Sequence, residues 1–174
     1  EMVQEELQGE WAERDYPIDD LLFVDDEQAD APDLPSEAAV VAHEDAELFD
    51  RFVASNVAPQ VQDGYSTIEV KVNQGDLAPD QFRGLARILR EYGASRARAT
   101  HWQNIVLRWI PTGNVYTVWR ELRALGLGNS GAYEINDIVS CPGTDSCKMG
   151  ITSSMGLSRA IQARVEEMHI QDPL

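Results

Sequence analysis

Residues 65–72 read Tyr65-Ser-Thr-Ile-Glu-Val-Lys-Val72 and alternate between two kinds of side chain. Serine, isoleucine and the two valines take every second position, and larger polar side chains stand between them. A period of two residues predicts a strand that buries one face, here the face of Ile68 and Val70. The turn-forming residues Asn73 to Asp76 follow, which predicts that the chain reverses there.

A helix is predicted downstream of this strand. Pro79 suits a first helical position, and Gly93 suits the residue after a helix end. Between them, apolar side chains recur at the three- and four-residue spacing of one helix face. They are Phe82, Leu85, Ala86, Ile88, Leu89 and Tyr92.

The pattern of strand and helix then repeats once. A second strand is predicted from about Arg98 to Ile110, and a second helix follows Pro111 and ends at Gly126. The helix residues expected to face inward are Val115, Val118, Trp119, Leu122 and Leu125. Residues 64–126 therefore form a predicted β-α-β-α unit. Because two strands alone do not make a stable sheet, this unit is expected to need a partner.

Charge divides the chain into two parts. Residues 1–63 contain 19 acidic and 2 basic residues, whereas residues 64–174 contain 11 acidic and 12 basic residues. The net charge of −16 is therefore −17 on the first part and +1 on the second. Because so acidic a surface repels the phosphate backbone, we expect no nucleic-acid partner. The change in composition places a boundary near Gly64.

The acidic part is interpreted as a strap that lies over a larger body. We expect a helix over residues 1–13, an exposed linker with two prolines over residues 25–35, and a short helix over residues 44–53. The side chains of the short helix expected to face inward are Leu48, Phe49 and Phe52.

The sequence indicates neither a membrane segment nor an export signal. No apolar run approaches the ~18 residues that a spanning helix needs. The first residues, Glu1 to Glu6, lack the basic region of a signal peptide. Two cysteines in 174 residues do not make a disulfide scaffold, which favours a cytoplasmic location.

Both cysteines lie in the segment Cys141-Pro-Gly-Thr-Asp-Ser-Cys147. A strand predicted over Ile135 to Ser140 leads into the first, and a helix predicted from Cys147 or Lys148 to about Met168 starts at the second. A thiolate at a helix start is stabilised by free backbone N–H groups and by the helix dipole. The helix residues expected to be partly inward are Met149, Thr152, Met155, Ile161, Val165 and Met168.

The spacing of five residues between the cysteines leaves several interpretations open. The pair could ligate a metal or an iron–sulfur cluster, close a small disulfide loop, lie buried in the core, or include a redox thiol. A mononuclear zinc site usually has closer spacing and needs two further ligands, for which His169 is the nearby candidate.

Three stretches, taken in order, resemble the sirohaem-dependent nitrite and sulfite reductases. They run from Tyr65 to Leu77, from Arg98 to Arg108, and from Ser140 to Ile161. The first two resemble the strands of the family's second ferredoxin-like half-domain, and the third resembles the first cysteine pair of its 4Fe-4S motif.

This resemblance implies an α+β fold. The implied division is an acidic helical strap and linker over residues 1–63, a ferredoxin-like half-domain over 64–127, and a truncated N-terminal part of the 4Fe-4S/sirohaem domain over 128–174. In the family two half-domains share one sheet, so the implied partners are the missing halves of a parent protein. An exposed sheet edge and an uncovered helix favour self-association of the fragment.

The resemblance also implies cofactors and site residues. Cys141 and Cys147 match two of the four ligands of the 4Fe-4S cluster, and a Cys-x3-Cys pair should follow Leu174. Gln103 falls where the family contacts sirohaem, and Arg98 is expected to pair with a carboxylate of that macrocycle. No catalytic residue is assigned.

The activity implied for the intact enzyme is six-electron reduction of sulfite to sulfide or of nitrite to ammonia. Its electron donor would be a ferredoxin or a flavoprotein, and the fragment alone would be inactive. The alternative hypothesis is a non-enzymatic α/β interaction module in which the two thiols are structural.

Overall fold

A computed structural model describes residues 33–168 and shows an α+β fold. The predicted helix over 1–13 and most of the linker over 25–35 lie outside the described residues, as does His169. The helices and strands, in chain order, are α3 (Ala46–Asn56), β1 (Val57–Pro59), β2 (Tyr65–Val70), α4 (Pro79–Tyr92), β3 (Ala97–Ala99), β4 (Ile105–Pro111), α5 (Val115–Ala124) and α6 (Ser154–Glu167).

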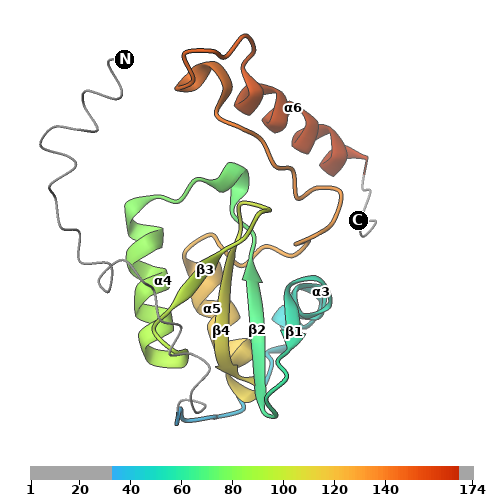
Figure 1. Cartoon of the computed structure of the whole chain (residues 1–174). Coiled ribbons are helices and arrows are strands. Elements are labelled where there is room, and N and C mark those ends of the chain that lie inside the picture. Colours follow the sequence, from blue (N-terminus) through green and yellow to red (C-terminus); the bar gives the residue numbers. More distant parts are fainter. Residues whose placement is uncertain (1–32, 169–174) are drawn as a thin grey trace, which may run out of the picture. The chain divides into compact units, whose positions relative to one another are not determined.

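The four strands form one antiparallel sheet in the order β1-β2-β4-β3. Figure 1 shows them side by side, with β1 and β3 at the two edges. The central pair aligns Ile68 with Leu107 and Val70 with Ile105. Residues 64–126 supply three of these strands and β1 precedes them, so the expectation that this unit supplies only two strands is wrong.

The predicted strand over 98–110 is in fact a β-hairpin. Its two arms, β3 and β4, pair through Arg98 and Val106. Between them the Thr100 N–H donates to the Asn104 carbonyl at 2.9 Å, and the Gln103 N–H donates to the Thr100 carbonyl at 3.1 Å. Gln103 takes a left-handed φ of 62° that glycine or asparagine usually occupies. The hairpin therefore turns without the residues by which a sequence normally reveals a turn.

Helix α4 begins at Pro79 and ends before Gly93, as predicted. Leu85, Ile88 and Leu89 are buried on its inner face. Phe82 was expected on that face, but its side chain is 58% exposed, so this part of the prediction is wrong.

Helix α5 follows Pro111 after a short 3-10 turn, and four of its predicted residues are buried. These are Val115, Val118, Trp119 and Leu122. Leu125 is half-buried. Gly126 has a φ of 72°, and the N–H of the next residue, Leu127, returns to the Leu122 carbonyl at 2.8 Å, which ends the helix.

Helix α3 belongs to the core of this fold. Phe52 is fully buried and contacts the Trp119 ring at a centroid distance of 6.2 Å, and the Phe49 and Tyr116 rings lie 5.1 Å apart. Leu48 is 48% exposed, so the prediction that it faces inward is wrong. The acidic segment thus contributes part of the hydrophobic core, besides packing over it.

Hydrogen bonds hold the residues before α3 against α5. Asn114 Nδ2 donates to the Pro35 carbonyl at 2.7 Å, and Tyr116 donates its hydroxyl to Asp45 at 2.8 Å. Arg123 also pairs with Asp45, at 2.7 Å. These contacts lower the pKa of Asp45, chiefly through the Tyr116 hydroxyl.

Two predictions for the C-terminal segment are wrong. Residues 135–140 form no strand, because a turn in which the Asp137 N–H bonds the Glu134 carbonyl at 2.8 Å bends them. Helix α6 begins at Ser154 rather than at Cys147 or Lys148. The hydroxyl of Ser153 accepts the Gly156 N–H and caps the helix at its true start.

Of the α6 residues expected to be partly inward, Met155 and Val165 are buried. The others are largely exposed; they are Met149, Thr152, Ile161 and Met168. No helix in the described part of the chain combines the length and the apolarity that crossing a membrane would require.

Candidate functional site: the cysteine loop

The two cysteines lie on a loop that folds back on itself. A 3-10 turn over Gly143–Asp145 follows Cys141, and the Cys147 N–H donates to the Gly143 carbonyl at 2.9 Å. Gly143 has a φ of 55°, and a Cβ there would lie 2.6 Å from the Thr152 carbonyl oxygen. Because a side chain would not fit, glycine is required where the loop closes.

Both thiols are free and exposed. This finding contradicts two of the open interpretations, a disulfide loop and a pair buried in the core. The Cys141 Sγ lies 3.4 Å from the Ser154 hydroxyl. Hydrogen bonding from Ser154, followed by that from the Gly143 backbone, lowers the pKa of Cys141. A lowered pKa favours the thiolate, which is the form that binds metal.

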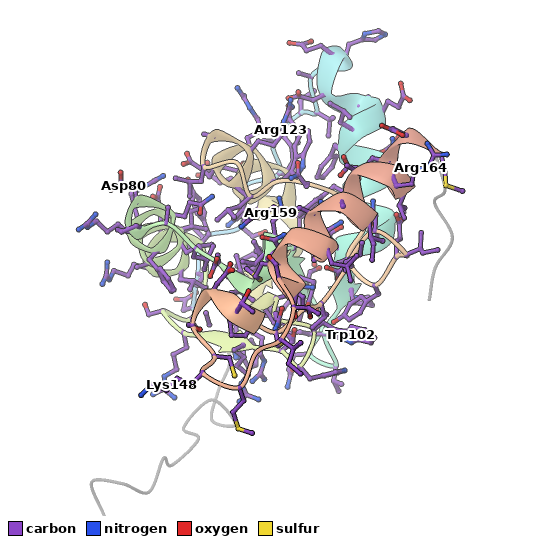
Figure 2. The ribbon with its side chains drawn as sticks, turned by 90° about the horizontal axis from the view of Figure 1, so that it is seen from above. Asp80, Trp102, Arg123, Lys148, Arg159 and Arg164 are labelled. Atoms are coloured by element: carbon purple, nitrogen blue, oxygen red, sulfur yellow. The ribbon has the colours of Figure 1, made fainter. Side chains whose placement is uncertain are left out.

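Two glutamine side chains tie the half-domain to the segment that carries the cysteines. Gln103 Nε2 donates to the Ser140 carbonyl at 2.9 Å, and the Ser140 N–H donates to Gln103 Oε1 at 3.4 Å. Gln74 Nε2 donates to the Met155 carbonyl at 3.2 Å. Arg159 then donates to Gln74 Oε1 at 3.1 Å, and Figure 2 shows Arg159 on helix α6.

A cavity of about 420 Å³ opens between these two glutamines. Its walls include Ser140 and Pro142, on either side of Cys141, and the apolar side chains of Leu77, Phe82 and Ile105. The residues predicted to contact a cofactor differ here. Gln103 lines the cavity, whereas Arg98 does not. The residue of β3 that lines it is Ala99, the next residue in the chain. Successive strand side chains point to opposite faces, so Arg98 points away from this cavity.

Three further side chains near the loop, Lys148, His101 and Trp102, are not among the residues that line this cavity. Lys148 follows Cys147 in the chain and is exposed, and Figure 2 shows it at the periphery of the molecule. His101 and Trp102 lie in the β3–β4 turn with ring centroids 5.1 Å apart, and Trp102 meets the Tyr133 ring edge-on. Their predicted place on a strand is therefore wrong.

Residues 33–168 contain no group of three or more histidine, cysteine and acidic side chains that could hold a metal ion. The chemistry of the loop nevertheless suits a cluster, since it offers two accessible thiols, one with a lowered pKa. The backbone of Gly143, in the tight turn, also hydrogen-bonds the Cys141 thiol. The residues thus fit half of a four-thiolate ligand set.

A buried polar network lies beneath the turn at residues 134–137 and was missed in the sequence. Asn104 accepts the Val72 N–H at 2.9 Å and donates to Asp137 at 2.8 Å. Lys71 donates to the Asn136 carbonyl at 2.9 Å and to its side-chain oxygen at 2.8 Å. The alternation in residues 65–72 predicted an exposed Lys71, but the turn at 134–137 covers it.

Glu69 was also predicted to be exposed and is buried in this network. Burial raises the pKa of Glu69, although hydrogen bonds from Tyr133 and Thr100 oppose the shift. Burial and the bond to Glu69 raise the pKa of Tyr133 to about 12. Burial lowers the pKa of Lys71, with the Asp137 charge acting in the opposite sense. The one signal of this network in the sequence was Asn104, a polar residue next to Gln103 in the predicted second strand.

The raised pKa of Glu69 predicts a pH dependence of stability. A carboxyl that binds its proton more tightly when folded stabilises the protein fully below its unfolded pKa, near 4.5. That contribution is lost as the pH rises through the higher folded value. Glu69→Gln is therefore expected to raise the free energy of unfolding, relative to the wild type, by more at pH 8 than at pH 4.5.

Urea unfolding at the two pH values measures this difference. Glu47→Gln, at an exposed position on α3, is the matched control and should leave the difference near zero. An equal effect of Glu69→Gln at both pH values would contradict the assignment.

Comparison with known proteins identifies this fold. Residues 58–125, which run from β1 to α5, match the family described as "Nitrite/Sulfite reductase ferredoxin-like half domain". The assimilatory-type sulfite reductase of Nitratidesulfovibrio vulgaris is 31% identical over 88 residues, which are 51% of this chain and 40% of that protein. The ferredoxin–nitrite reductase of Synechococcus elongatus is 28% identical over 119 residues, or 68% of this chain and 23% of that protein.

The NAD(P)H nitrite reductase of Emericella nidulans is 24% identical over 128 residues, which are 72% of this chain and 11% of that protein. All three of these relatives are named as reductases. Over residues 58–125, the chain is similar to the ferredoxin-like half-domain of the nitrite and sulfite reductase family, and relatives named as sulfite and nitrite reductases match parts of it. The matched parts cover well under two thirds of each of these relatives.

Proposed function

We propose that this chain is part of a reductase of sulfite or nitrite that carries sirohaem and a 4Fe-4S cluster, with Cys141 and Cys147 as two of the four cluster ligands. The observation that carries the proposal is the pair of free, exposed thiols on a closed loop beside the half-domain of that family. When bound, the cluster and sirohaem would supply the electron-transfer chemistry for six-electron reduction to sulfide or ammonia, and Cys141 and Cys147 would hold the cluster.

The chain's own contribution is to hold and orient. Ser154 and the Gly143 backbone lower the pKa of Cys141, so this ligand loses its proton more easily when it binds iron. A group seated in the cavity would lie next to the backbone on both sides of Cys141. Gln103 is proposed to face sirohaem there, and Arg98 is proposed to pair with a macrocycle carboxylate outside the cavity.

The remaining parts of the enzyme are proposed to come from sequence beyond these 174 residues. They include the other half-domain, the second ligand pair and the substrate-binding residues, so the piece alone would be inactive. A ferredoxin is the proposed electron donor, because one relative is named for ferredoxin; another is named for NAD(P)H, which would suit a flavoprotein. A cytoplasmic location fits the reduced thiols.

The test replaces each ligand in the full-length protein, purified without oxygen. Cys141→Ser and Cys147→Ser are each expected to abolish the charge-transfer absorption of the cluster and to reduce cluster iron to background, because the hydroxyl of serine replaces a thiolate ligand poorly. Iron analysis and absorption spectra measure both. Ser146→Ala, an exposed change in the same loop, should keep the cluster. A cluster retained in both cysteine variants would refute the proposal.

The reading frame gives a second test that needs no protein. A Cys-x3-Cys pair is expected in the coding sequence within about 60 residues after position 174, the scale of one or two supersecondary units. A frame that continues without such a pair would also refute the proposal.

The alternative function is an interaction module with two structural thiols. It predicts that the cysteine substitutions alter only stability. Exposure of both thiols argues against it, because a cysteine stabilises a fold mainly by being buried.

A further inference from the structure

Two glutamines hold unfavourable backbone conformations next to the cysteine loop. Gln74 has a φ of 59° and Gln103 a φ of 62°, in the left-handed region that disfavours residues with a Cβ. Glycine or asparagine would occupy these positions more easily. At both positions, however, the side-chain amide bonds the backbone of the cysteine segment. At each position, the left-handed backbone is thus found together with a side-chain amide that bonds the cysteine segment.

The two turns also interlock. Gly75 follows Gln74, and a Cβ added to Gly75 would lie 3.1 Å from the Cβ of Gln103. That approach would be tighter than ordinary van der Waals contact, so position 75 has little room for a side chain beside Gln103. The two turns therefore pack closely, and a glycine at position 75 leaves the Gln103 side chain its place.

Gln103 bonds both polar groups of one peptide residue. Its amide donates to the Ser140 carbonyl at 2.9 Å and accepts from the Ser140 N–H at 3.4 Å. Ser140 directly precedes Cys141, so this pair of hydrogen bonds fixes the direction in which the chain enters the loop. A side chain longer or shorter by one carbon would not make both contacts.

From this geometry we infer that Gln103 is a positioning residue for Cys141, which orients the first thiol of the loop through Ser140. This role rests on the proposed function of Cys141 as a ligand, and it differs from direct contact with a cofactor. One of the two Nε2 hydrogens bonds the Ser140 carbonyl, so the other remains available to a group in the cavity that Gln103 lines.

Hydrogen exchange in the cofactor-free 174-residue chain tests the inference. Gln103→Met keeps the length of the side chain and removes both bonds, so amide exchange in a peptide covering residues 138–147 is expected to quicken about 3- to 10-fold. Gln103→Asn, one carbon shorter, should do the same. Peptides from β2 and β4 should not change. Gln81→Met is the matched control, since Gln81 Nε2 bonds the Leu125 carbonyl at 3.0 Å, away from the loop.

A second variant guards against a general loss of folding. Gln103→Gly relieves the left-handed backbone, so its resistance to urea should equal or exceed that of Gln103→Met, while the loop still exchanges faster. Unchanged exchange in all three Gln103 variants would overturn the inference. So would faster exchange that spreads equally over the sheet, which would mark a merely structural residue.

The same variants in the full-length protein separate the inference from the proposed function. Gln103→Met should keep the cluster iron and shift the cluster's reduction potential or magnetic-resonance spectrum, as expected when a ligand is reoriented. If the exchange result holds but Cys141→Ser keeps its cluster, the proposed function fails and the positioning of the loop stands. A spectrum and potential identical to those of the wild type, with the cluster present, would overturn the positioning role.

Discussion

Phe52→Ala is expected to lower the free energy of unfolding of the 174-residue chain by about 3–5 kcal/mol. Phe52 is fully buried and packs on Trp119 of α5 in the same core as Ile68 and Ile88. Removing its ring leaves a cavity that the surrounding strands and helices can fill only partly. Urea unfolding followed by circular dichroism measures the loss.

Leu48→Ala is the matched control on the same helix. Leu48 is 48% exposed, so its truncation should cost less than about 1 kcal/mol. If both substitutions cost the same small amount, α3 would be a loosely attached strap, as its acidic composition suggested. A large loss for Phe52 alone would establish α3 as part of the folded core.

Asn104→Leu is expected to cost about 3 kcal/mol, although leucine has nearly the same shape. The change leaves the buried Val72 N–H without its acceptor and removes a donor from the buried Asp137 carboxylate. Each unsatisfied buried group costs about 1–3 kcal/mol. The Tyr133 N–H still donates to Asp137, at 3.0 Å, which limits the loss.

Asn73→Leu makes the same change at an exposed position only one residue from Val72. It should alter the free energy of unfolding by less than about 0.5 kcal/mol. A neutral or stabilising Asn104→Leu would show that the polar network does not hold the turn at 134–137 against the sheet. Comparing the urea midpoints and slopes of the two variants distinguishes a change in stability from a change in the unfolded state.

The parts of the fold that the sequence predicted correctly are those with strong local signals. Helix α4 begins at Pro79 and ends before Gly93, and α5 ends at Ala124, two residues before Gly126, so proline and glycine mark both helices. The two-residue alternation located β2. These features depend on backbone preferences within a few residues of each other, which a sequence displays directly.

Other elements depend on contacts between distant residues and were missed. The β3–β4 turn uses a left-handed glutamine, so neither glycine nor asparagine marked it. Strand β1 has only three residues and exists because it pairs with β2. Residues 135–140 are apolar enough to suggest a strand, but their hydrogen bonds go to a turn and to the side chain of Gln103.

The cysteines of the candidate site could be picked out from the sequence, but the contacts that hold their loop in place could not. Spacing and resemblance drew attention to Cys141 and Cys147, and their role as ligands stays a prediction. Nothing local to the cysteines indicated that Ser154 would lie beside one thiol, or that Gln103 would bond the residue before it. Such contacts cross from one turn to another and become visible only in three dimensions.

The short edge strands carry a practical consequence for recombinant expression. At present the edges are β1, with three residues and Pro59, and β3, with three residues and Arg98. Short, charged or proline-bearing edges resist pairing with other molecules. A recombinant piece begun at Gly64 would lack β1 and Phe52, and the six residues of β2 would become an open edge rich in β-branched side chains. Such a piece should be poorly soluble, whereas one that begins before α3 keeps its edge covered.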